Sequence, residues 1–436
     1  ILESGGIKSM PNDRDQNLSP EEPEEKKYSF LQETIKPKPI SRQQLAQQLV
    51  RIAIYGVILG VFACLGFFAL KPWMQDIFRG DLETVTIPED EDPAETDESV
   101  SEEVSQSDEN TSVNADSYEK IMASMNERAS EAEKGIVSVQ AVTGEMDWDA
   151  QMTGISTSVT GVIAADNGQE LLILADSSIC EKANKWSVTF EDGASYDAAL
   201  KKQDLNTGLA MFSVSRGNIT DATWSAIKVS VLGNSNLVKQ GDVVMSLGNM
   251  FGYPGGMSYG IVSSTDYRAV FYDGECDVLS TDITYESGGT GALFNMEGEV
   301  VGIVSSSVWK TDEQSGLSAY AISDLKTIIE IMANGESVPY IGIHGTTVTQ
   351  ALKDEQGMPS GVYVVDVDPD SPAMEAGIQS GDVICQVDGK DVGSISTYQS
   401  AVLETAAGRV IRLQGRRLGT DGYVEVDFSV TVGSKE

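Results

Sequence analysis

Histidine is nearly absent from this chain of 436 residues, which contains one, His344. The four cysteines, Cys64, Cys180, Cys276 and Cys385, are widely spaced and form no C-x-x-C pair. Because zinc sites need Cys and His ligands at close spacing, this composition predicts no metal site, and we expect no cofactor. A disulfide between Cys180 and Cys276 is an alternative, although we favour buried free thiols.

Basic residues are also scarce. Lys and Arg number 30 against 67 Asp and Glu, so the net charge is -37. A chain this anionic should repel phosphates, which argues against nucleic-acid binding. Residues 81–120 contain fifteen of the acidic residues and one Lys. With few large apolar residues, 81–117 is predicted to be a disordered spacer, and the alternative is an electrostatic tether.

One long run contains no charge at all. Ile52–Leu70 is nineteen residues long, which at 1.5 Å per residue approaches the roughly 30 Å hydrocarbon core of a bilayer. It lacks the polar face of a core helix, and fifty mostly polar residues precede it, unlike a signal peptide. We therefore predict a transmembrane helix at 51–72. Met10 is a candidate start, since the chain begins at Ile1.

Basic residues near the ends of this run predict its orientation. Positive residues concentrate on the cytoplasmic side of a membrane span. We expect a single-pass protein of the cell membrane, with residues 1–50 as a cytoplasmic tail and the C-terminal domains extracytoplasmic. The basic residues nearest the run are six before it and two after it: Lys26, Lys27, Lys36, Lys38, Arg42 and Arg51, then Lys71 and Arg79.

Beyond the run, three segments differ in residue composition and hydrophobic pattern. Residues 73–134 are predicted to be an acidic disordered linker with a candidate helix at Tyr118–Lys134. From Gly135, short β-rich stretches such as GIVSVQAV and ELLILAD alternate with glycine and Asp-Gly turns, which indicates a β-barrel or sandwich. Near Pro339 a smaller unit begins, with strands and two candidate helices, Pro372–Ala376 and Thr397–Thr405.

Three stretches carry a family resemblance. They are GDVVMSLGNMFGYPGGMSYGIVSS at Gly241–Ser264, NMEGEVVGIVS at Asn295–Ser305 and SPAMEAGIQSGDVICQVDGKDV at Ser371–Val392. The chain resembles the HtrA/DegP family, membrane-anchored or periplasmic trypsin-like serine proteases with a C-terminal PDZ domain. The resemblance implies a mainly β fold: a trypsin-like double β-barrel at 135–335, then a PDZ domain at 338–433, preceded by the single transmembrane helix.

The catalytic triad of that family is altered here. Its histidine segment resembles Ile173–Cys180 (ILADSSIC), which puts Ser178 at the histidine position. Its aspartate pattern resembles DLNTGLAM, which puts Gly208 at the aspartate position. Its nucleophile loop resembles TDITYESGGTGAL, which is one residue shorter than usual. Counting back from Leu293 then places Gly289 at the nucleophile position.

Other alignments of this loop place Thr290 or Ser287 at the nucleophile position. A serine hydroxyl needs a neighbouring base, and losing the triad serine or histidine costs about 10⁶ in rate. Ser-Gly-Gly is also an ordinary turn sequence, which we favour. We expect no catalytic residue, with Ser287 and Thr290 as fallback nucleophiles. A Ser-Lys dyad would draw on nearby lysines: Lys182, Lys185, Lys201 and Lys202.

The smaller unit offers a binding site instead. Tyr340-Ile341-Gly342-Ile343 resembles the carboxylate-binding loop of the family's PDZ domain, in which backbone amides hold a peptide C-terminus. Gly342 would allow close approach of those amides, and Ile341 and Ile343 would line an apolar pocket. His344 is expected to be a surface or pocket-side residue of this domain rather than a displaced base.

These observations predict a membrane-anchored pseudoprotease. It would bind extracytoplasmic peptides or unfolded proteins with free C-termini, as an adaptor, sensor or chaperone in envelope protein quality control. The alternative is an active endopeptidase with a rearranged site at Ser287 or Thr290. A third reading is a structural partner, because the resemblance implies a homo-trimer or a mixed assembly with active homologues.

Overall fold

The computed structural model describes residues 55, 83–90, 115–142, 158–182, 184–306 and 316–436. The chain divides into two units, Ile1–Phe78 and Arg79–Glu436, and the elements below belong to the second. None of the helices in these described ranges is long and apolar enough to cross a membrane. The predicted tail 1–50 and span 51–72 lie outside the described residues, except for Tyr55.

The first barrel closes in the order β1-β2-β3-β6-β5-β4, with every neighbouring pair antiparallel. Strand side chains alternate between two faces, so one face of each strand can fill the interior. Ile163, Ile173 and Phe212 do so and are fully buried. The strands are β1 (Ile136–Ala141), β2 (Ser158–Asp166), β3 (Glu170–Asp176), β4 (Trp186–Thr189), β5 (Ser195–Asp204) and β6 (Leu209–Ser215).

The second barrel closes in the order β10-β11-β12-β9-β8-β7. Its longest strand, β8, has 16 residues and continues into β9 through a turn formed by Tyr272 and Asp273. This β8–β9 hairpin reaches the site described below. The strands are β7 (Val243–Asn249), β8 (Gly256–Phe271), β9 (Gly274–Thr281), β10 (Thr290–Phe294), β11 (Val300–Val304) and β12 (Ser318–Ala321).

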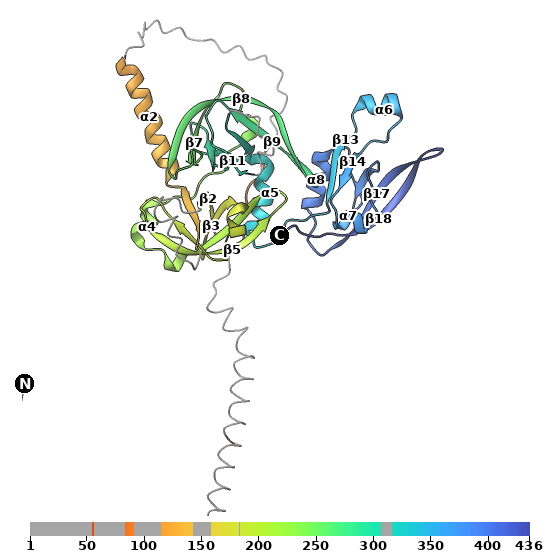
Figure 1. The fold of residues 1–436 in the computed structure, drawn as a ribbon, viewed down its shortest axis with the longest axis horizontal. Helices are drawn as coiled ribbons and strands as arrows, with labels where there is room; N and C mark the ends of the chain where they lie inside the picture. Colours follow the sequence, from red (N-terminus) through yellow and green to blue (C-terminus); the bar gives the residue numbers. More distant parts are fainter. Residues whose placement is uncertain (1–54, 56–82, 91–114, 143–157, 183, 307–315) are drawn as a thin grey trace, which may run out of the picture. The chain divides into compact units, whose positions relative to one another are not determined.

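The two barrels share one buried cluster. Leu174 of β3 and Leu247 of β7 belong to it, together with one face of helix α5 (Ile322–Ala333). Burying apolar surface stabilises such an interface by about 25 cal/mol per Å². The pair of closed barrels confirms the trypsin-like double β-barrel that the sequence predicted (Figure 1).

A sheet in the order β13-β14-β15-β17-β18 forms the C-terminal domain, with β16 paired to β15. It encloses its own buried cluster, which includes Ile343, Tyr398 and Leu413. This confirms the predicted PDZ-like sheet. The strands are β13 (Ile343–Thr347), β14 (Val362–Val367), β15 (Val383–Val387), β16 (Lys390–Asp391), β17 (Val410–Gly419) and β18 (Gly422–Thr431).

Both helices predicted for this domain are present. Helix α7 (Pro372–Glu375) begins after Ser371, whose hydroxyl accepts from the Met374 amide at 3.3 Å. Helix α8 (Ile395–Leu403) begins two residues before the predicted start, because Ser394 caps it by accepting from the Thr397 amide at 3.2 Å. Capping side chains satisfy amides that a helix end leaves unpaired. A third helix, α6 (Gln350–Gln356), was not predicted.

Helix α2 (Ala115–Glu133) leads into the first barrel and begins earlier than the expected Tyr118. Ala129 and Ala132 bury one side of it in the cluster shared by the barrels (Figure 1). The remaining short helices are η1 (Ser177–Lys182), η2 (Arg216–Asn218), α4 (Asp221–Ala226) and η3 (Ser235–Leu237).

Residues 83–90 differ from the disorder predicted for 81–117. Val85 packs against the shared cluster, its amide donates to Asn334 Oδ1 at 2.9 Å, and its carbonyl accepts from Asn334 Nδ2 at 2.9 Å. Asp90 pairs with Lys326 of α5 at 2.7 Å, and Lys326 is only 4% exposed. Composition did not predict that this segment is ordered. One buried cation and two apolar side chains are enough to fix it against the barrels.

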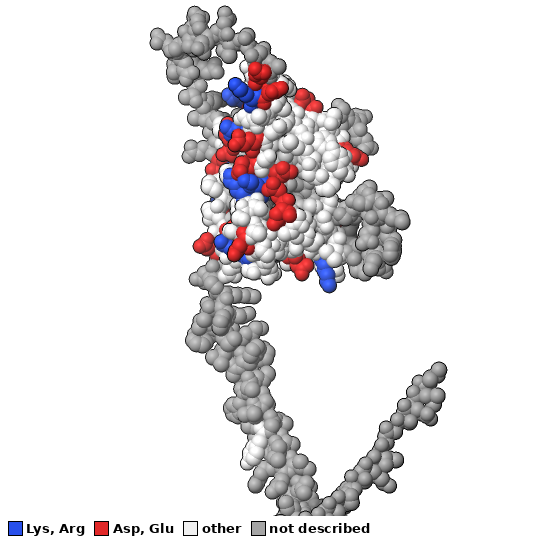
Figure 2. Space-filling model, turned by 90° about the vertical axis from the view of Figure 1, so that its left-hand side faces the viewer, with Lys and Arg blue, Asp and Glu red and all other residues white. Residues whose placement is uncertain are grey.

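Acidic and basic residues are mixed on the surface that carries α2. Figure 2 shows Lys and Arg interspersed with Asp and Glu on this face, beside a wide uncharged area. Lys134 pairs with Glu131, and Arg216 pairs with Asp166 at 3.0 Å. The charge of the described residues on this face therefore forms no single-sign patch.

Candidate active-site positions and peptide-binding loop

The nucleophile turn lies between β9 and β10 and satisfies its own amides. The Gly289 amide donates to the Glu286 carbonyl at 2.9 Å, and the Gly288 amide donates to Tyr285 Oη at 3.0 Å. The Glu286 amide in turn donates to the Met250 carbonyl at 2.9 Å. An oxyanion hole needs amides that point at a developing charge. These three amides are already engaged within the barrel.

Gly289, the residue counted back to the nucleophile position, leaves no room for a side chain. A Cβ placed there would lie 2.9 Å from both Cα and O of Met250 and 3.0 Å from the Asn249 carbonyl oxygen. All three are backbone atoms at the end of β7, so they cannot rotate away. These backbone atoms occupy the space that the side chain of a nucleophile at position 289 would need.

The two fallback nucleophiles have different surroundings. Thr290 is 2% exposed, and its Oγ1 accepts from the Thr160 amide at 2.8 Å while Thr160 Oγ1 donates to the Thr290 carbonyl at 2.9 Å. This reciprocal pair joins β2 of the first barrel to β10 of the second. Ser287 is exposed at the tip of the turn. The buried threonine therefore connects the barrels, and the serine faces solvent.

Ser178 and Gly208, which the resemblance puts at the histidine and aspartate positions, belong to two segments that one hydrogen bond joins. Ser178 lies in η1, directly after β3, and Gly208 lies in the turn before β6 with φ of 77°. The Ser177 amide donates to the Gly208 carbonyl at 2.9 Å, which ties the two segments together. Under that alignment, the hydroxyl of Ser178 and the hydrogen of Gly208 could not replace the imidazole and the carboxylate in proton transfer.

Asp176, which sequence reasoning did not single out, lies beside these positions. It is 3% exposed and accepts from the Ser178 amide at 2.9 Å, from Ser305 Oγ at 2.7 Å and from the Ser306 amide at 2.8 Å. These bonds tie the end of β3 to the segment after β11. A buried carboxylate surrounded by donors is a stable cross-link between the barrels. An acidic residue ending a buried strand was the signal for it.

Two of the four lysines considered for a dyad are paired elsewhere. Lys201 Nζ bonds Glu170 at 2.7 Å, and Lys202 Nζ bonds Ser337 Oγ at 2.8 Å and Glu436 at 2.9 Å. Lys185 is exposed. In these positions they are solvated or neutralised rather than activated by burial.

The loop predicted to bind peptides, Tyr340–Ile343, holds a carboxylate from another part of the chain. The amides of Ile341, Gly342 and Ile343 all donate to the side chain of Asp273, at 2.6, 2.7 and 3.0 Å. The hydroxyl of Tyr398, in α8, donates to it at 2.8 Å. Asp273 belongs to the turn of the β8–β9 hairpin and is 5% exposed. Three of the four predicted loop residues therefore form an anion site.

The loop takes this shape because of Gly342, whose φ is 94°. A Cβ there would lie 2.4 Å from Ser371 Cβ, so only glycine fits. The side chains of Ile341 and Ile343 are fully buried in the core of the domain. Burial raises the pKa of Asp273 above its usual range, and the amides of Gly342, Ile343 and Ile341 oppose that rise.

Tyr340 differs from its three neighbours. Its amide donates to the Gly433 carbonyl at 2.9 Å, and its hydroxyl donates to Asp368. Its ring meets that of Tyr272, beside Asp273, edge to face at 6.2 Å. Burial raises the pKa of Tyr340 well above its ordinary value. Tyr340 therefore supports the turn that reaches the loop instead of binding the carboxylate.

The remaining candidates of the sequence lie as follows. His344 is half-buried on β13, and its ring meets that of Tyr272 at 6.4 Å, inside the PDZ-like domain and not beside the nucleophile turn. Cys180, Cys276 and Cys385 are free thiols, so the alternative disulfide is absent. Within the described ranges, no group of three or more His, Cys, Asp or Glu side chains could hold a metal ion.

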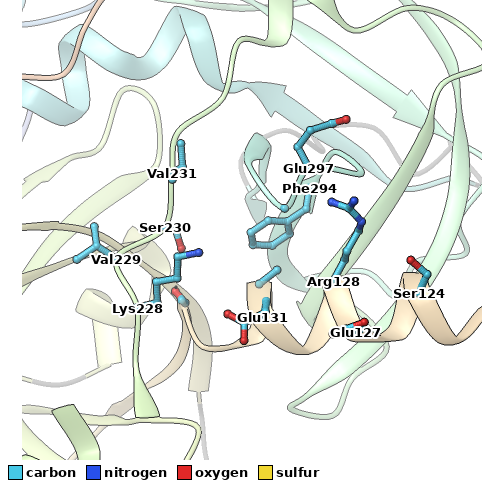
Figure 3. Close-up of a pocket in the computed structure, with 13 residues that line it drawn as sticks. Ser124, Glu127, Arg128, Glu131, Lys228, Val229, Ser230, Val231, Phe294 and Glu297 are labelled. Carbon is cyan, nitrogen blue, oxygen red and sulfur yellow. Dashed lines mark hydrogen bonds between the residues drawn. The ribbon is translucent and has the colours of Figure 1, made fainter. Parts of the chain in front are cut away.

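A cavity of about 360 Å³ opens elsewhere, between α2 and the second barrel. Figure 3 shows Glu127, Arg128 and Glu131 along α2 facing Lys228 and the ring of Phe294. Charges of both signs line it, and Lys134 lowers the pKa of Glu131 by pairing with it. The lining favours neither a cation nor an anion, and it contains none of the candidate residues above.

Two family profiles match the chain: a trypsin-like peptidase domain over residues 159–303 and a PDZ domain over residues 339–428. These ranges agree with the double barrel and the C-terminal sheet. The first contains the positions of Ser178, Gly208 and Gly289, and the second contains the loop Tyr340–Ile343.

Curated relatives include a protein described as a probable periplasmic serine endoprotease DegP-like, from Halomonas elongata. It is 30% identical over 280 residues, 63% of this chain and 56% of the relative. The serine protease Do-like HtrB of Bacillus subtilis is 31% identical over 254 residues, 54% of either chain. The chain thus spans about half the length of these relatives. A solved structure, the HtrA-type protease AlgW with tripeptide, superposes with a TM-score of 0.51 at 23% identity, covering 71% of this chain and 96% of that one, which shows a common fold.

Proposed function

Because the chain belongs to the HtrA family, we propose that it is a membrane-anchored pseudoprotease that binds peptides through its PDZ domain. Its ligands are extracytoplasmic peptides or unfolded protein segments with free C-termini. Its role is that of an adaptor, sensor or chaperone in envelope protein quality control. The observation that carries the proposal is the convergence of the Ile341, Gly342 and Ile343 amides on one carboxylate.

The chemistry of this anion site suits a peptide C-terminus. A terminal carboxylate accepts from loop amides while the peptide extends as a strand along a sheet edge. β13 occupies an end of the sheet order, with β14 as its one neighbour among the described strands. A protein of the same fold, the HtrA-type protease AlgW, was solved with a tripeptide.

Loss of proteolysis is supported by the nucleophile turn. The Gly288 and Gly289 amides donate hydrogen bonds within the turn, and backbone atoms of Met250 fill the space beside Gly289. The single histidine of the chain, His344, lies on β13. Without an imidazole near the turn, a triad enzyme loses about 10⁶ in rate. Ser287, exposed on the turn, is the nucleophile of the competing proposal, an active endopeptidase.

Anchoring in the cell membrane rests on the uncharged run Ile52–Leu70 and on the basic residues before it. In this arrangement the barrels and the PDZ domain are extracytoplasmic. Assembly as a homo-trimer, or with active homologues, is part of the same proposal and follows from the family resemblance.

Peptide binding is tested with pairs of fluorescein-labelled decapeptides that end in Val, Leu, Phe or Ala, each made as a free acid and as a C-terminal amide. Fluorescence anisotropy on the detergent-solubilised full chain should show free acids binding at least tenfold more tightly than amides. The reason is that hydrogen bonds to a charged group contribute about 1.5–3 kcal/mol. Equal affinity for acids and amides would rule out carboxylate recognition.

Proteolysis is tested separately, with a fluorophosphonate label and a casein cleavage assay. We expect neither labelling nor cleavage above the level of Ser287→Ala. Labelling that disappears in Ser287→Ala would establish the active endopeptidase instead.

A further inference from the structure

The turn of the β8–β9 hairpin is bound in the PDZ domain from two sides. On the β13 side, the Asp273 amide donates to the Ile343 carbonyl at 2.7 Å. On the α8 side, the Glu275 amide donates to Gln399 Oε1 at 3.1 Å, and Tyr398 Oη donates to Asp273. The turn therefore lies between β13 and α8, each of which contributes hydrogen bonds to it.

Asp273 makes both contacts that the last residue of a bound peptide would make. A peptide added beside β13 offers its terminal carboxylate to the loop amides and exchanges backbone hydrogen bonds with the strand. Asp273 offers its side-chain carboxylate to Ile341, Gly342 and Ile343, and its backbone amide to Ile343. The same three amides cannot hold a second carboxylate at the same time.

The geometry of the turn is specific for this role. Asp273 adopts a φ of 61°, a left-handed conformation that Asp tolerates better than most residues. Tyr272 is fixed by Asn206, whose Nδ2 donates to the Tyr272 carbonyl at 2.7 Å and whose Oδ1 accepts from its amide at 3.1 Å. Next to it, a Cβ on Gly274 would lie 2.6 Å from Gln399 Cδ, so a larger residue there would displace the Gln399 side chain.

The contact also explains how an acidic residue can be buried here. A carboxylate removed from water is costly unless donors replace the lost hydration. Asp273 receives four donors, three amides and one hydroxyl, all from the PDZ domain, whereas Asp273 itself belongs to a hairpin of the second barrel. Among the described residues, no side-chain cation hydrogen-bonds Asp273, so its carboxylate is held mainly by backbone amides, as a chain terminus would be.

We propose that Asp273 is an internal ligand of the PDZ domain, and that a peptide with a free C-terminus binds only when the β8–β9 turn withdraws. The inference rests on the proposed function, since it assumes that the loop takes peptide carboxylates. It makes the PDZ domain self-inhibited: the apparent dissociation constant equals the intrinsic one divided by the fraction of molecules in which the turn is withdrawn. Because β8 and β9 are strands of the second barrel, withdrawal of their turn on peptide binding would change the position of this hairpin in that barrel.

The test compares the full-length wild type with Asp273→Asn and with a matched control, Asp266→Asn. Asparagine retains the shape and the left-handed tolerance of Asp273 but removes the charge that the amides bind. Asp266 is an exposed aspartate on β8 of the same hairpin. With the free-acid decapeptides above, Asp273→Asn should lower the dissociation constant at least tenfold, while Asp266→Asn leaves it within twofold of wild type.

Hydrogen exchange read by mass spectrometry supplies an independent measurement on the same three proteins. Peptic fragments that contain Ile341–Ile343 should exchange at least tenfold faster in Asp273→Asn than in wild type or Asp266→Asn, because an NH₂ group replaces one of the two accepting oxygens and the other loses its charge. Circular dichroism confirms that each variant is folded.

The outcomes separate the two proposals. Peptide binding of equal strength in wild type and Asp273→Asn, with unchanged exchange at the loop, overturns the internal ligand and leaves the peptide-binding function standing. Faster exchange without binding of any free-acid peptide by any variant overturns the peptide-binding function, and the inference with it. Tighter binding together with faster exchange supports both.

Discussion

Two glycine-containing turns of this molecule present backbone amides, and they use them in opposite ways. In the nucleophile turn of the second barrel, the amides of Gly288 and Gly289 donate to Tyr285 and Glu286 of the same turn. In the PDZ loop, the amides of Ile341, Gly342 and Ile343 converge on a carboxylate more than sixty residues away in sequence. The amides of the first turn are paired locally, whereas those of the second are paired with a carboxylate from a distant part of the chain.

The difference arises from what lies behind each turn. Backbone atoms of Asn249 and Met250 press against Gly289, so the short nucleophile turn folds onto itself. Ser371 presses against Gly342, but here the left-handed glycine turns successive amides outward to one point. Since buried amides must be paired, the PDZ loop needs an acceptor and the nucleophile turn does not. Anion binding thus survives in one turn only.

The largest effect is expected from Gly342→Ala, which would break the anion site. The added Cβ would meet Ser371 at 2.4 Å in a backbone conformation with φ of 94°. Strain and overpacking together should lower the free energy of unfolding by about 2–4 kcal/mol and abolish binding of free-acid peptides. Urea denaturation and anisotropy measure the two changes.

Its matched control is Gly393→Ala, at an exposed glycine where the nearest atom is Ser360 Oγ at 4.0 Å. That variant should retain wild-type stability within about 0.5 kcal/mol. A Gly342→Ala protein that binds free-acid peptides as wild type does would show that the loop is not the site.

A second, smaller effect is expected from Gly289→Ser, which restores a hydroxyl at the nucleophile position. The Cβ at 2.9 Å from the Met250 backbone should cost about 1–3 kcal/mol of stability. Fluorophosphonate labelling should stay at background, because no base is added. The control is Ser287→Ala, at an exposed residue, whose stability should be unchanged. A Gly289→Ser protein that is stable and labelled would show that the nucleophile turn can rearrange to expose a reactive hydroxyl.

Tyr398→Phe should weaken the anion site without abolishing it. It removes one of four donors to Asp273 and keeps the buried ring in place. The expected loss is about 1 kcal/mol in the free energy of unfolding, with exchange of the Ile341–Ile343 amides accelerated severalfold. Tyr423→Phe, a half-buried tyrosine of β18, controls for loss of a hydroxyl. Exchange that is equal in the two variants would show that Tyr398 does not hold the carboxylate.

The smallest effect concerns the thiols, which report whether the barrel stays closed when the PDZ loop is released. Burial raises the pKa of Cys180 to about 11 and that of the fully buried Cys276 well above its usual value. At pH 8 a thiol with that pKa is about one part in 10³ thiolate, so labelling by Ellman's reagent should be slow.

In a Cys64→Ser background, Asp273→Asn should leave the labelling rate of Cys276 within twofold, since Cys276 Sγ contacts the Ala321 carbonyl inside the barrel. Unfolding in guanidinium should expose all three remaining thiols and calibrates the assay. A large increase in thiol labelling of the folded protein would show that the second barrel opens when Asp273 no longer binds the PDZ loop.

Much of the architecture was predictable from local patterns. Buried strands such as Glu170–Asp176 show continuous apolar runs, and the turns between strands carry glycine. The helix predicted at Thr397–Thr405 lies within two residues of α8 at either end. The loop Tyr340–Ile343 was singled out because it resembles the carboxylate-binding loop of the family's PDZ domain. Segment 83–90 was not found, since its order depends on one buried lysine of α5.

From the sequence, through its resemblance to the HtrA/DegP family, we predicted Ser178 and Gly208 at the histidine and aspartate positions and Gly342 within a carboxylate-binding loop. Those properties are local: side-chain chemistry and backbone freedom belong to single residues. Only the tertiary structure decided that Asp273 meets the loop amides and that Met250 fills the space at Gly289. Such contacts join residues far apart in the chain, and they form because buried polar groups must find partners and packed backbones leave no voids.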